Sequence, residues 1–222
     1  MSNAVLILGE SGSGKSTSIR ALNPDETMII NVIGKPLPFK GGQSKYKRIS
    51  QDGKEGNYYA SDDPSMIIKL LRLVNTQRID IKTVILDDFG YTYTNAFMRT
   101  INQKGYDKFN MLGKAAFDIL EEIQALRDDL FCFVMMHTEI DSQGKYKPKT
   151  IGNVIDKHIV IEGKFSYCLH ALTTEGKYHF LTNNDGQHMA KSPIGLFDEL
   201  YINNDLQLVR DKITDYYNEE TL

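Results

Sequence analysis

Residues 4–17 of this 222-residue chain read AVLILGESGSGKST, and this stretch decides the expected fold. Residues 4–8 form an apolar run with the composition of a buried strand. The run leads directly into GESGSGKS at residues 9–16, which matches the pattern G-x-x-x-x-G-K-[ST]. A helix is expected next, over about residues 14–22. A strand, a glycine-rich loop and a helix in this order indicate an α/β fold with the loop at one edge of a sheet.

Each residue type in this loop suits the binding of a phosphate chain. Glycines let successive backbone N–H groups point at phosphate oxygens, and the following helix adds the positive end of its dipole. Lys15 would reach the β- and γ-phosphates, and the Ser16 hydroxyl would bind Mg²⁺. The alternative is a chance glycine-rich turn, which the flanking strand and helix disfavour. The sequence predicts a P-loop for ATP and Mg²⁺, formed by Gly9, Glu10, Ser11, Gly12, Ser13, Gly14, Lys15, Ser16 and Thr17.

Composition and charge restrict the class of protein. Hydrophobic residues make up 41% and charged residues 25%, values typical of a globular protein with one sizeable core. The net charge of −3 means that any nucleic-acid surface must be local. Cys132 and Cys168 lie in apolar runs and are expected to be buried thiols. No apolar run is long enough for a membrane helix and no basic leader begins the chain, so we expect a cytoplasmic protein.

A second informative stretch, TVILDD, occupies residues 83–88. Four strand-favouring residues end in two carboxylates, which is typical of a Walker B strand. In P-loop proteins an Asp at the end of a buried strand holds Mg²⁺ through water, and Asp87 is predicted to have this role. Asp88 is predicted to polarise the attacking water. The alternative for Asp88 is that it caps the helix that follows.

The rest of the chain alternates between strand and helix patterns, which predicts a mostly parallel sheet flanked by helices, with antiparallel hairpins toward the C-terminus. We expect a single P-loop ATPase domain over residues 1–222. Its core covers about 4–195, and its terminal helix about 205–218. Further strands are expected at 28–33, 46–49, 130–136, 165–172 and 178–182, helices at 64–77, 91–101, 111–129 and 151–159, and a polar loop at 141–149.

Two segments interleave basic and aromatic residues. Cations can follow a phosphate chain and aromatic faces can stack on bases, so both segments are candidates for binding single-stranded DNA. The alternative is that both are ordinary solvated loops. The predicted DNA-binding residues are Lys104, Tyr106, Lys108 and Phe109 in the first segment, and Lys145, Tyr146, Lys147 and Lys149 in the second.

The order of these parts resembles the ATPase core of the RecA/RadA recombinases, over about residues 4–195. GKPLPF at 34–39 and AKSPIG at 190–195 look like segments of the short, core-only RecA/RadA-like proteins of bacteriophages, which act as single-strand annealing proteins or recombinases. The resemblance implies that residues 102–110 and 138–150 are loops facing single-stranded DNA. It also implies assembly into a ring or filament, and a host-cell cytoplasmic location.

The resemblance gives roles to two further residues. His137 follows the strand at 130–136 and takes the position of the family's γ-phosphate sensor, which is usually glutamine. Lys191 follows the second hairpin and would reach the γ-phosphate of a neighbouring subunit. The alternatives are a hydrogen-bonded histidine at a strand end and a solvated surface lysine.

One departure keeps other functions open. The family places a catalytic glutamate just after its second strand, but residues 31–35 read NVIGK, without an acid. Asp88 must then serve instead, or hydrolysis is slow. The double Asp at 87–88 is closer to an AAA+ ATPase such as a helicase loader, and a nucleotide-dependent interaction module is a further alternative. The expected function is an ATP-hydrolysing, oligomeric, phage-type recombination protein that binds single-stranded DNA, with a single-stranded DNA-binding protein or other phage replication proteins as further partners.

Overall fold

The computed structural model describes residues 3–102, 104–105, 107–156 and 159–219. Within these residues, eight strands form one sheet in the order β10-β9-β8-β1-β5-β4-β2-β3. The six strands from β8 to β3 in this order are parallel, whereas β9 runs antiparallel to both of its neighbours, β8 and β10. The fold is therefore α/β with a mostly parallel central sheet, as the sequence predicted.

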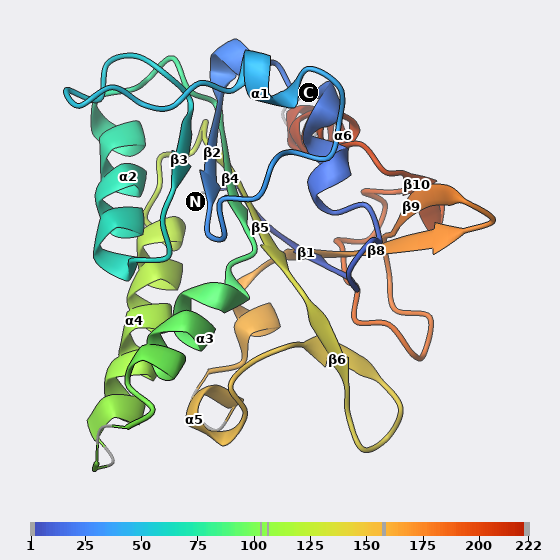
Figure 1. Cartoon of the computed structure of the whole chain (residues 1–222). Helices are drawn as coiled ribbons and strands as arrows, with labels where there is room; N and C mark the ends of the chain where they lie inside the picture. The colour runs from blue at the N-terminus through green and yellow to red at the C-terminus, as the bar shows by residue number, and fades with distance from the viewer. Residues whose placement is uncertain (1–2, 103, 106, 157–158, 220–222) are drawn as a thin grey trace.

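Figure 1 shows these elements in space. The strands of the sheet are β1 (Asn3–Leu8), β2 (Thr27–Asn31), β3 (Tyr58–Ala60), β4 (Thr83–Asp87), β5 (Phe131–Met136), β8 (Tyr167–Thr174), β9 (Lys177–Leu181) and β10 (Tyr201–Asn203). A separate hairpin contains β6 (Thr138–Ile140) and β7 (Tyr146–Pro148). The helices are α1 (Gly42–Lys45), α2 (Pro64–Thr76), α3 (Gly90–Arg99), α4 (Asp107–Gln124), α5 (Asn153–Asp156) and α6 (Leu206–Glu219), with the 3-10 helices η1 (Ser16–Ala21), η2 (Pro24–Glu26) and η3 (Ile161–Lys164).

Helices cover both faces of the sheet, with α2 and α4 on one side and η1 and α6 on the other (Figure 1). Successive residues of a strand point to opposite faces, so β1 contributes to both cores. Leu6 packs with α2 and α4, whereas Ile7 packs with η1 and α6. Burial on both faces explains why β1 is apolar throughout instead of alternating. Cys132 and Cys168 are buried free thiols, as predicted.

The helix after the glycine-rich loop differs from the expectation. It is a six-residue 3-10 helix, η1, instead of an α-helix over 14–22. The Ser18 hydroxyl donates to the Lys15 carbonyl oxygen at 2.5 Å, and the Ser18 N–H is shared between the carbonyls of Gly14 and Lys15. Such local bonds from serine compete with regular α-helical bonding. Pro24 prevents extension of the helix beyond residue 22, as expected.

Two expectations for the segment between β2 and α2 were wrong in part. The expected strand at 46–49 is reduced to one bridge between Arg48 and Tyr58, and α1 precedes it. No strand was expected at residues 58–60, but Tyr58 and Tyr59 belong to the edge strand β3 beside β2. In contrast, α2 begins as predicted, because the Asp63 carboxylate accepts a hydrogen bond from the Ser65 N–H at 2.9 Å.

The segment at 141–149 was expected to be a polar loop; residues 141–145 are the turn of the β6–β7 hairpin, but residues 146–148 form the strand β7. The Asp141 carboxylate accepts the backbone N–H groups of Gln143 and Lys145, which orders the turn. The helix expected at 111–129 is α4, which begins four residues earlier and ends five residues earlier. No strand was predicted at β10, which pairs with β9.

The C-terminal helix α6 packs against η1 and so returns the end of the chain to the main core, as predicted. In the part of the chain that the structure describes, no helix is both long and apolar enough to cross a membrane.

Candidate functional site

The glycine-rich loop, defined as residues 9–16, leaves the end of β1 in a conformation that requires glycine. Gly14 has φ +95°, and a Cβ atom there would lie 2.7 Å from the Tyr178 ring. A Cβ atom at Gly9 would lie 2.5 Å from the Ser13 hydroxyl oxygen and 2.7 Å from the Ala171 carbonyl oxygen. The loop is thus folded tightly between its own residues and the β8–β9 hairpin.

Lys15 folds back over this loop. Its ammonium donates to the carbonyl oxygens of Gly9 and Glu10, each at 2.7 Å, and the residue is only 5% exposed. Burial lowers the pKa of Lys15 to about 8, against the opposing effect of the carboxylates of Asp88 and Asp87. The loop therefore holds a buried cation whose charge is sensitive to its surroundings.

The predicted metal-binding pair, Ser16 and Asp87, comes together across 71 residues of sequence. The Ser16 hydroxyl lies 3.0 Å from each carboxylate oxygen of Asp87. Asp87 ends β4 and is 3% exposed. Burial and then the nearby Asp88 carboxylate raise the pKa of Asp87 to about 6. A cation beside this carboxylate would stabilise its ionised form.

Asp88 contacts the other predicted residue, His137. Its φ of +63° places it in the left-handed region, which Asp tolerates better than most residues. One carboxylate oxygen lies 3.2 Å from His137 Nε2. Burial opposes ionisation of Asp88, but the hydrogen bond from His137 and the charges of His137, Lys35 and Lys15 together outweigh it, so the pKa of Asp88 is lowered. The N-cap residue of α3 is Phe89, and no side chain forms a capping hydrogen bond there. Asp88 is therefore not the N-cap of this helix.

Strand register explains why these residues meet. Leu8 at the end of β1 is level with Met136 at the end of β5, and β5 lies between β1 and β4. The loop, His137 and the two acids therefore leave three neighbouring strands at the same edge, where ligands bind in open parallel sheets. Figure 1 shows the C-terminal ends of β1, β4 and β5 near one another.

The second strand ends at Asn31, which is level with Asp87. Its side chain accepts from the Gly34 N–H at 2.7 Å and donates to the Lys35 carbonyl oxygen at 3.0 Å. Asn31 thus orders the 32–35 loop. Lys35 was not predicted as a site residue, but its charge acts on both Lys15 and Asp88.

The first predicted DNA-binding segment is partly helical, because α4 begins at residue 107. Lys104 is exposed. The Phe109 ring stacks on Phe97, with centroids 5.9 Å apart. Tyr106 and the side chain of Lys108 lie outside the described residues.

The second predicted segment is the β6–β7 hairpin, where the four residues differ in surroundings. Lys145 and Lys149 are exposed. The Lys147 ammonium pairs with the carboxylates of Glu139 at 3.1 Å and Asp156 at 2.8 Å. The remaining residue, Tyr146, is partly buried.

Tyr146 belongs to an aromatic cluster with His170 and His188, which sequence reasoning missed. Its ring stacks on His188 with centroids 4.6 Å apart, and His170 meets both rings edge-on. A cavity of about 270 Å³ separates the cluster from residues 10–13 of the glycine-rich loop. Among the described residues, neither the His170 ring nitrogens nor the Ser13 hydroxyl has a hydrogen-bond partner of standard geometry.

Lys191 lies farther from the loop along the sheet. Its backbone exchanges two hydrogen bonds of 2.8 Å with Cys168. Cys168 is level with Leu6, two residues before the end of β1. Within one chain, Lys191 therefore does not belong to the site around Lys15.

The described residues contain no group of three or more His, Cys, Asp or Glu side chains arranged to hold a metal ion. No protein-family model matches the chain, and no curated protein matches it.

Proposed function

We propose that the chain binds the Mg²⁺ complex of ATP in the glycine-rich loop and hydrolyses its terminal phosphate. The observation that carries this proposal is the contact of the Ser16 hydroxyl with both oxygens of Asp87, beside the buried ammonium of Lys15. A hydroxyl, a carboxylate and a lysine at one strand edge are the groups that hold Mg²⁺ and phosphates in nucleotide hydrolases.

The residues present fit Mg²⁺. This ion takes oxygen ligands in an octahedral arrangement, and it commonly uses one or two carboxylates, several waters and the phosphates of the substrate. Ser16 would supply one oxygen ligand and Asp87 would hold a water ligand, so a cluster of three acidic residues is not required. When bound, Mg²⁺ would neutralise charge that develops on the β- and γ-phosphates.

The chain's own groups then divide the work. Lys15 exchanges its contacts with the carbonyls of Gly9 and Glu10 for contacts with phosphate oxygens. Because η1 is a short 3-10 helix, few aligned peptide dipoles assist phosphate binding. Binding then depends mainly on the N–H groups of the loop and on Lys15. Asp88 orients and deprotonates the attacking water, and its hydrogen bond to His137 keeps the carboxylate ionised and in place.

A second part of the proposal links this site to single-stranded DNA. The β6–β7 hairpin begins one residue after His137, and it exposes Lys145 and Lys149. In this proposal the protein is a phage-type, RecA/RadA-like recombination ATPase that acts as an oligomer. The adjacent pair Asp87 and Asp88 favours an AAA+-like replication ATPase as the competing function. The amide of Asn31, where an acid is expected, favours a module with little hydrolysis.

The test compares ATP binding and phosphate release by the wild-type protein and by Lys15→Ala, with Lys40→Ala as an exposed-lysine control. Removing one partner of a buried charge contact costs roughly 2–5 kcal/mol, so Lys15→Ala should weaken binding about 30-fold or more. Normal ATP binding by Lys15→Ala would contradict the proposal. Repeating the assay with single-stranded DNA, a gel shift and a size measurement tests the second part, because indifference to DNA would favour the competing functions.

A further inference from the structure

The β8–β9 hairpin lies against the glycine-rich loop. Thr173 and Tyr178 face each other across the hairpin. The Thr173 hydroxyl lies 3.5 Å from the Gly12 carbonyl oxygen, and the Tyr178 ring covers the Cα atom of Gly14. The two strands of this hairpin therefore each contact one glycine of the loop.

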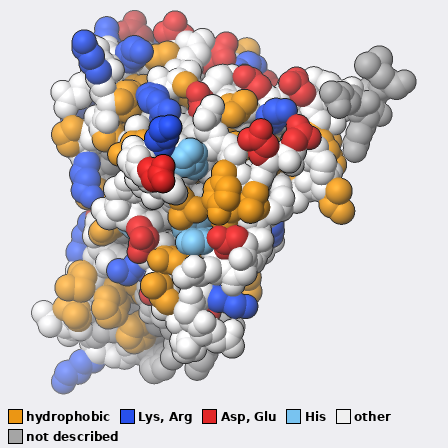
Figure 2. Space-filling model, turned by 90° about the vertical axis from the view of Figure 1, so that its right-hand side faces the viewer, with side chains coloured by type: hydrophobic (Ala, Val, Ile, Leu, Met, Phe, Trp, Pro, Cys, Tyr) orange, Lys and Arg blue, Asp and Glu red, His pale blue; other side chains and the backbone are white. Residues whose placement is uncertain are grey.

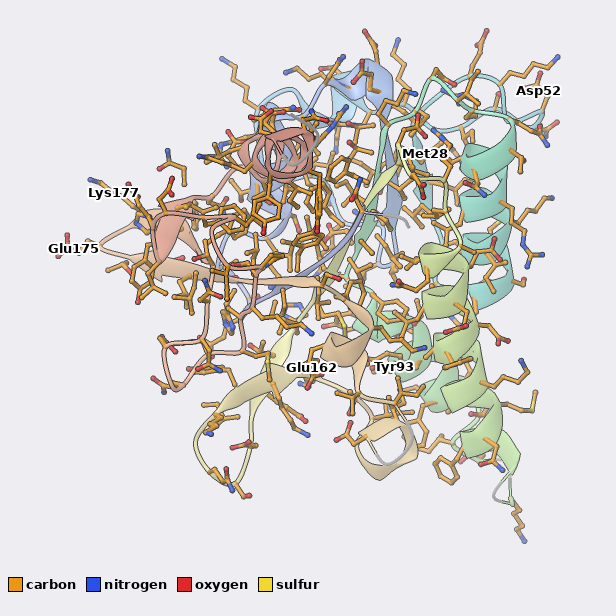
Figure 3. All side chains as sticks on the ribbon, turned by 180° about the vertical axis from the view of Figure 1, so that it is seen from behind. Met28, Asp52, Tyr93, Glu162, Glu175 and Lys177 are labelled. Carbon is orange, nitrogen blue, oxygen red and sulfur yellow. The ribbon has the colours of Figure 1, made fainter. Side chains whose placement is uncertain are left out.

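The contact with Gly14 buries only part of the Tyr178 side chain. A Cβ atom at Gly14 would meet the ring atoms Cδ1 at 2.7 Å and Cγ at 2.8 Å, so the ring touches the loop near its base. The residue is nevertheless 40% exposed. Figure 3 labels Lys177, the residue before it, and Glu175 at the projecting end of the hairpin. Much of an aromatic ring is thus open to a ligand beside the loop.

The side of the molecule that carries β9 and β10 also shows other apolar groups. Figure 2 looks at this side and shows hydrophobic side chains gathered between basic and acidic ones. Ile194, Leu200 and Tyr201 are, like Tyr178, large hydrophobic side chains with substantial exposure. Among these exposed side chains, Tyr178 contacts the glycine-rich loop at Gly14.

The strand order gives a bound nucleotide a direction. β1 lies between β5 and β8. The acids and His137 stand on the β5–β4 side, so the terminal phosphate must lie on that side. The nucleoside, at the other end of the phosphate chain, then leaves the loop toward β8 and β9, where Tyr178 stands.

We infer that Tyr178 stacks on the base of the bound nucleotide and selects purine nucleoside triphosphates. This inference rests on the proposed function. A tyrosine ring contacts the face of a base and not its hydrogen-bonding edge, so it distinguishes large rings from small ones and is tolerant of the edge. ATP and GTP should therefore bind with similar gains from Tyr178, and UTP with a smaller gain.

The experiment measures binding of four ligands by calorimetry, namely the Mg²⁺ complexes of ATP, GTP, UTP and tripolyphosphate. Tyr178→Ala should weaken ATP and GTP binding roughly tenfold, since base stacking on an aromatic ring contributes at about this level. UTP should lose less, so that the ratio of ATP to UTP affinity falls toward one. Tripolyphosphate has no base and should lose nothing. Tyr178→Phe should bind as the wild type does, and Tyr201→Ala is the matched control.

Each other outcome overturns the inference. Equal losses for ATP, UTP and tripolyphosphate would mean that Tyr178 only shapes the loop through Gly14. Unchanged ATP and UTP binding by a folded Tyr178→Ala protein would mean that the ring does not contact the base, while the proposed phosphate site would stand. A wild-type protein that binds none of the four ligands would remove the proposed function and this inference together.

Discussion

The two flanks of β1 place different kinds of side chain beside the same loop. The acidic flank, at the ends of β4 and β5, holds Asp87, Asp88 and His137. The aromatic flank, on β8 and β9, holds His170 and Tyr178. The first flank can bind a cation and move a proton, whereas the second offers rings to a planar ligand. For the nucleotide of the proposed function, this strand order would place the reacting phosphate on the acidic flank and the base on the aromatic flank.

The largest expected effect is on the acidic flank, from Asp88→Asn. Asn has the same shape, tolerates the left-handed backbone at this position and still accepts a hydrogen bond from His137. It cannot accept the proton of water. We expect phosphate release to fall roughly 100- to 10,000-fold with little change in ATP affinity.

Asp198→Asn, which changes an exposed carboxylate, is the control for this measurement. If Asp88→Asn released phosphate at the wild-type rate, the acidic flank would have no general base at this position, and its contrast with the aromatic flank would reduce to charge.

The next effect lies on the aromatic flank, where stability should depend on pH through His170. Burial and then the neighbouring His188 lower the pKa of His170 to about 4, from an ordinary value of 6.5. As pH falls from 6.5 to 4, the unfolded chain gains this proton first, so the folded state loses stability across that window. The full loss from this group is about 3 kcal/mol, because each pKa unit corresponds to about 1.4 kcal/mol.

His170→Phe removes this titration and keeps a ring in the cluster. Chemical denaturation at several pH values should show a loss of stability between pH 6.5 and 4 that is smaller by about 3 kcal/mol than in the wild type. Asp87, whose raised pKa acts with the opposite sign in part of this range, is present in both proteins and cancels in the difference. Superimposable curves would show that His170 is not held neutral.

The smallest effect concerns the hairpin that joins the two flanks. Lys145 is exposed, whereas Lys147 is already paired with Glu139 and Asp156. If single-stranded DNA contacts the hairpin, Lys145→Ala should reduce the slope of log affinity against log salt by about 0.7. Lys147→Ala should change the slope less. A larger change from Lys147→Ala would show that its ion pairs open on binding.

The acidic flank could be predicted from sequence because its signals are local. An apolar strand that ends in Asp87 and a glycine-rich loop that ends in Ser16 are each recognisable alone, and parallel strands bring such ends to one edge. The β4 bounds, the α2 cap at Asp63 and the β8–β9 hairpin follow from the same kind of local pattern.

The aromatic flank could not be predicted in this way. Nothing near Tyr178 in sequence indicates that its ring covers Gly14, because 164 residues separate the two and the contact depends on β8 lying beside β1. Tyr146 was predicted to face DNA, but its ring packs on His188, which lies far away in the sequence. The 3-10 form of η1 was missed because local serine hydrogen bonds outweigh helix propensity there.

His137 connects the central sheet directly to the β6–β7 hairpin. β5 ends at Met136 and β6 begins at Thr138, so His137 is the single residue between the central sheet and the hairpin. The Lys149 N–H donates to the His137 carbonyl oxygen at 2.8 Å and closes the base of the hairpin. No other residue lies between these two parts, so a change in the tilt of the hairpin would change the backbone dihedral angles at His137, whose imidazole contacts Asp88.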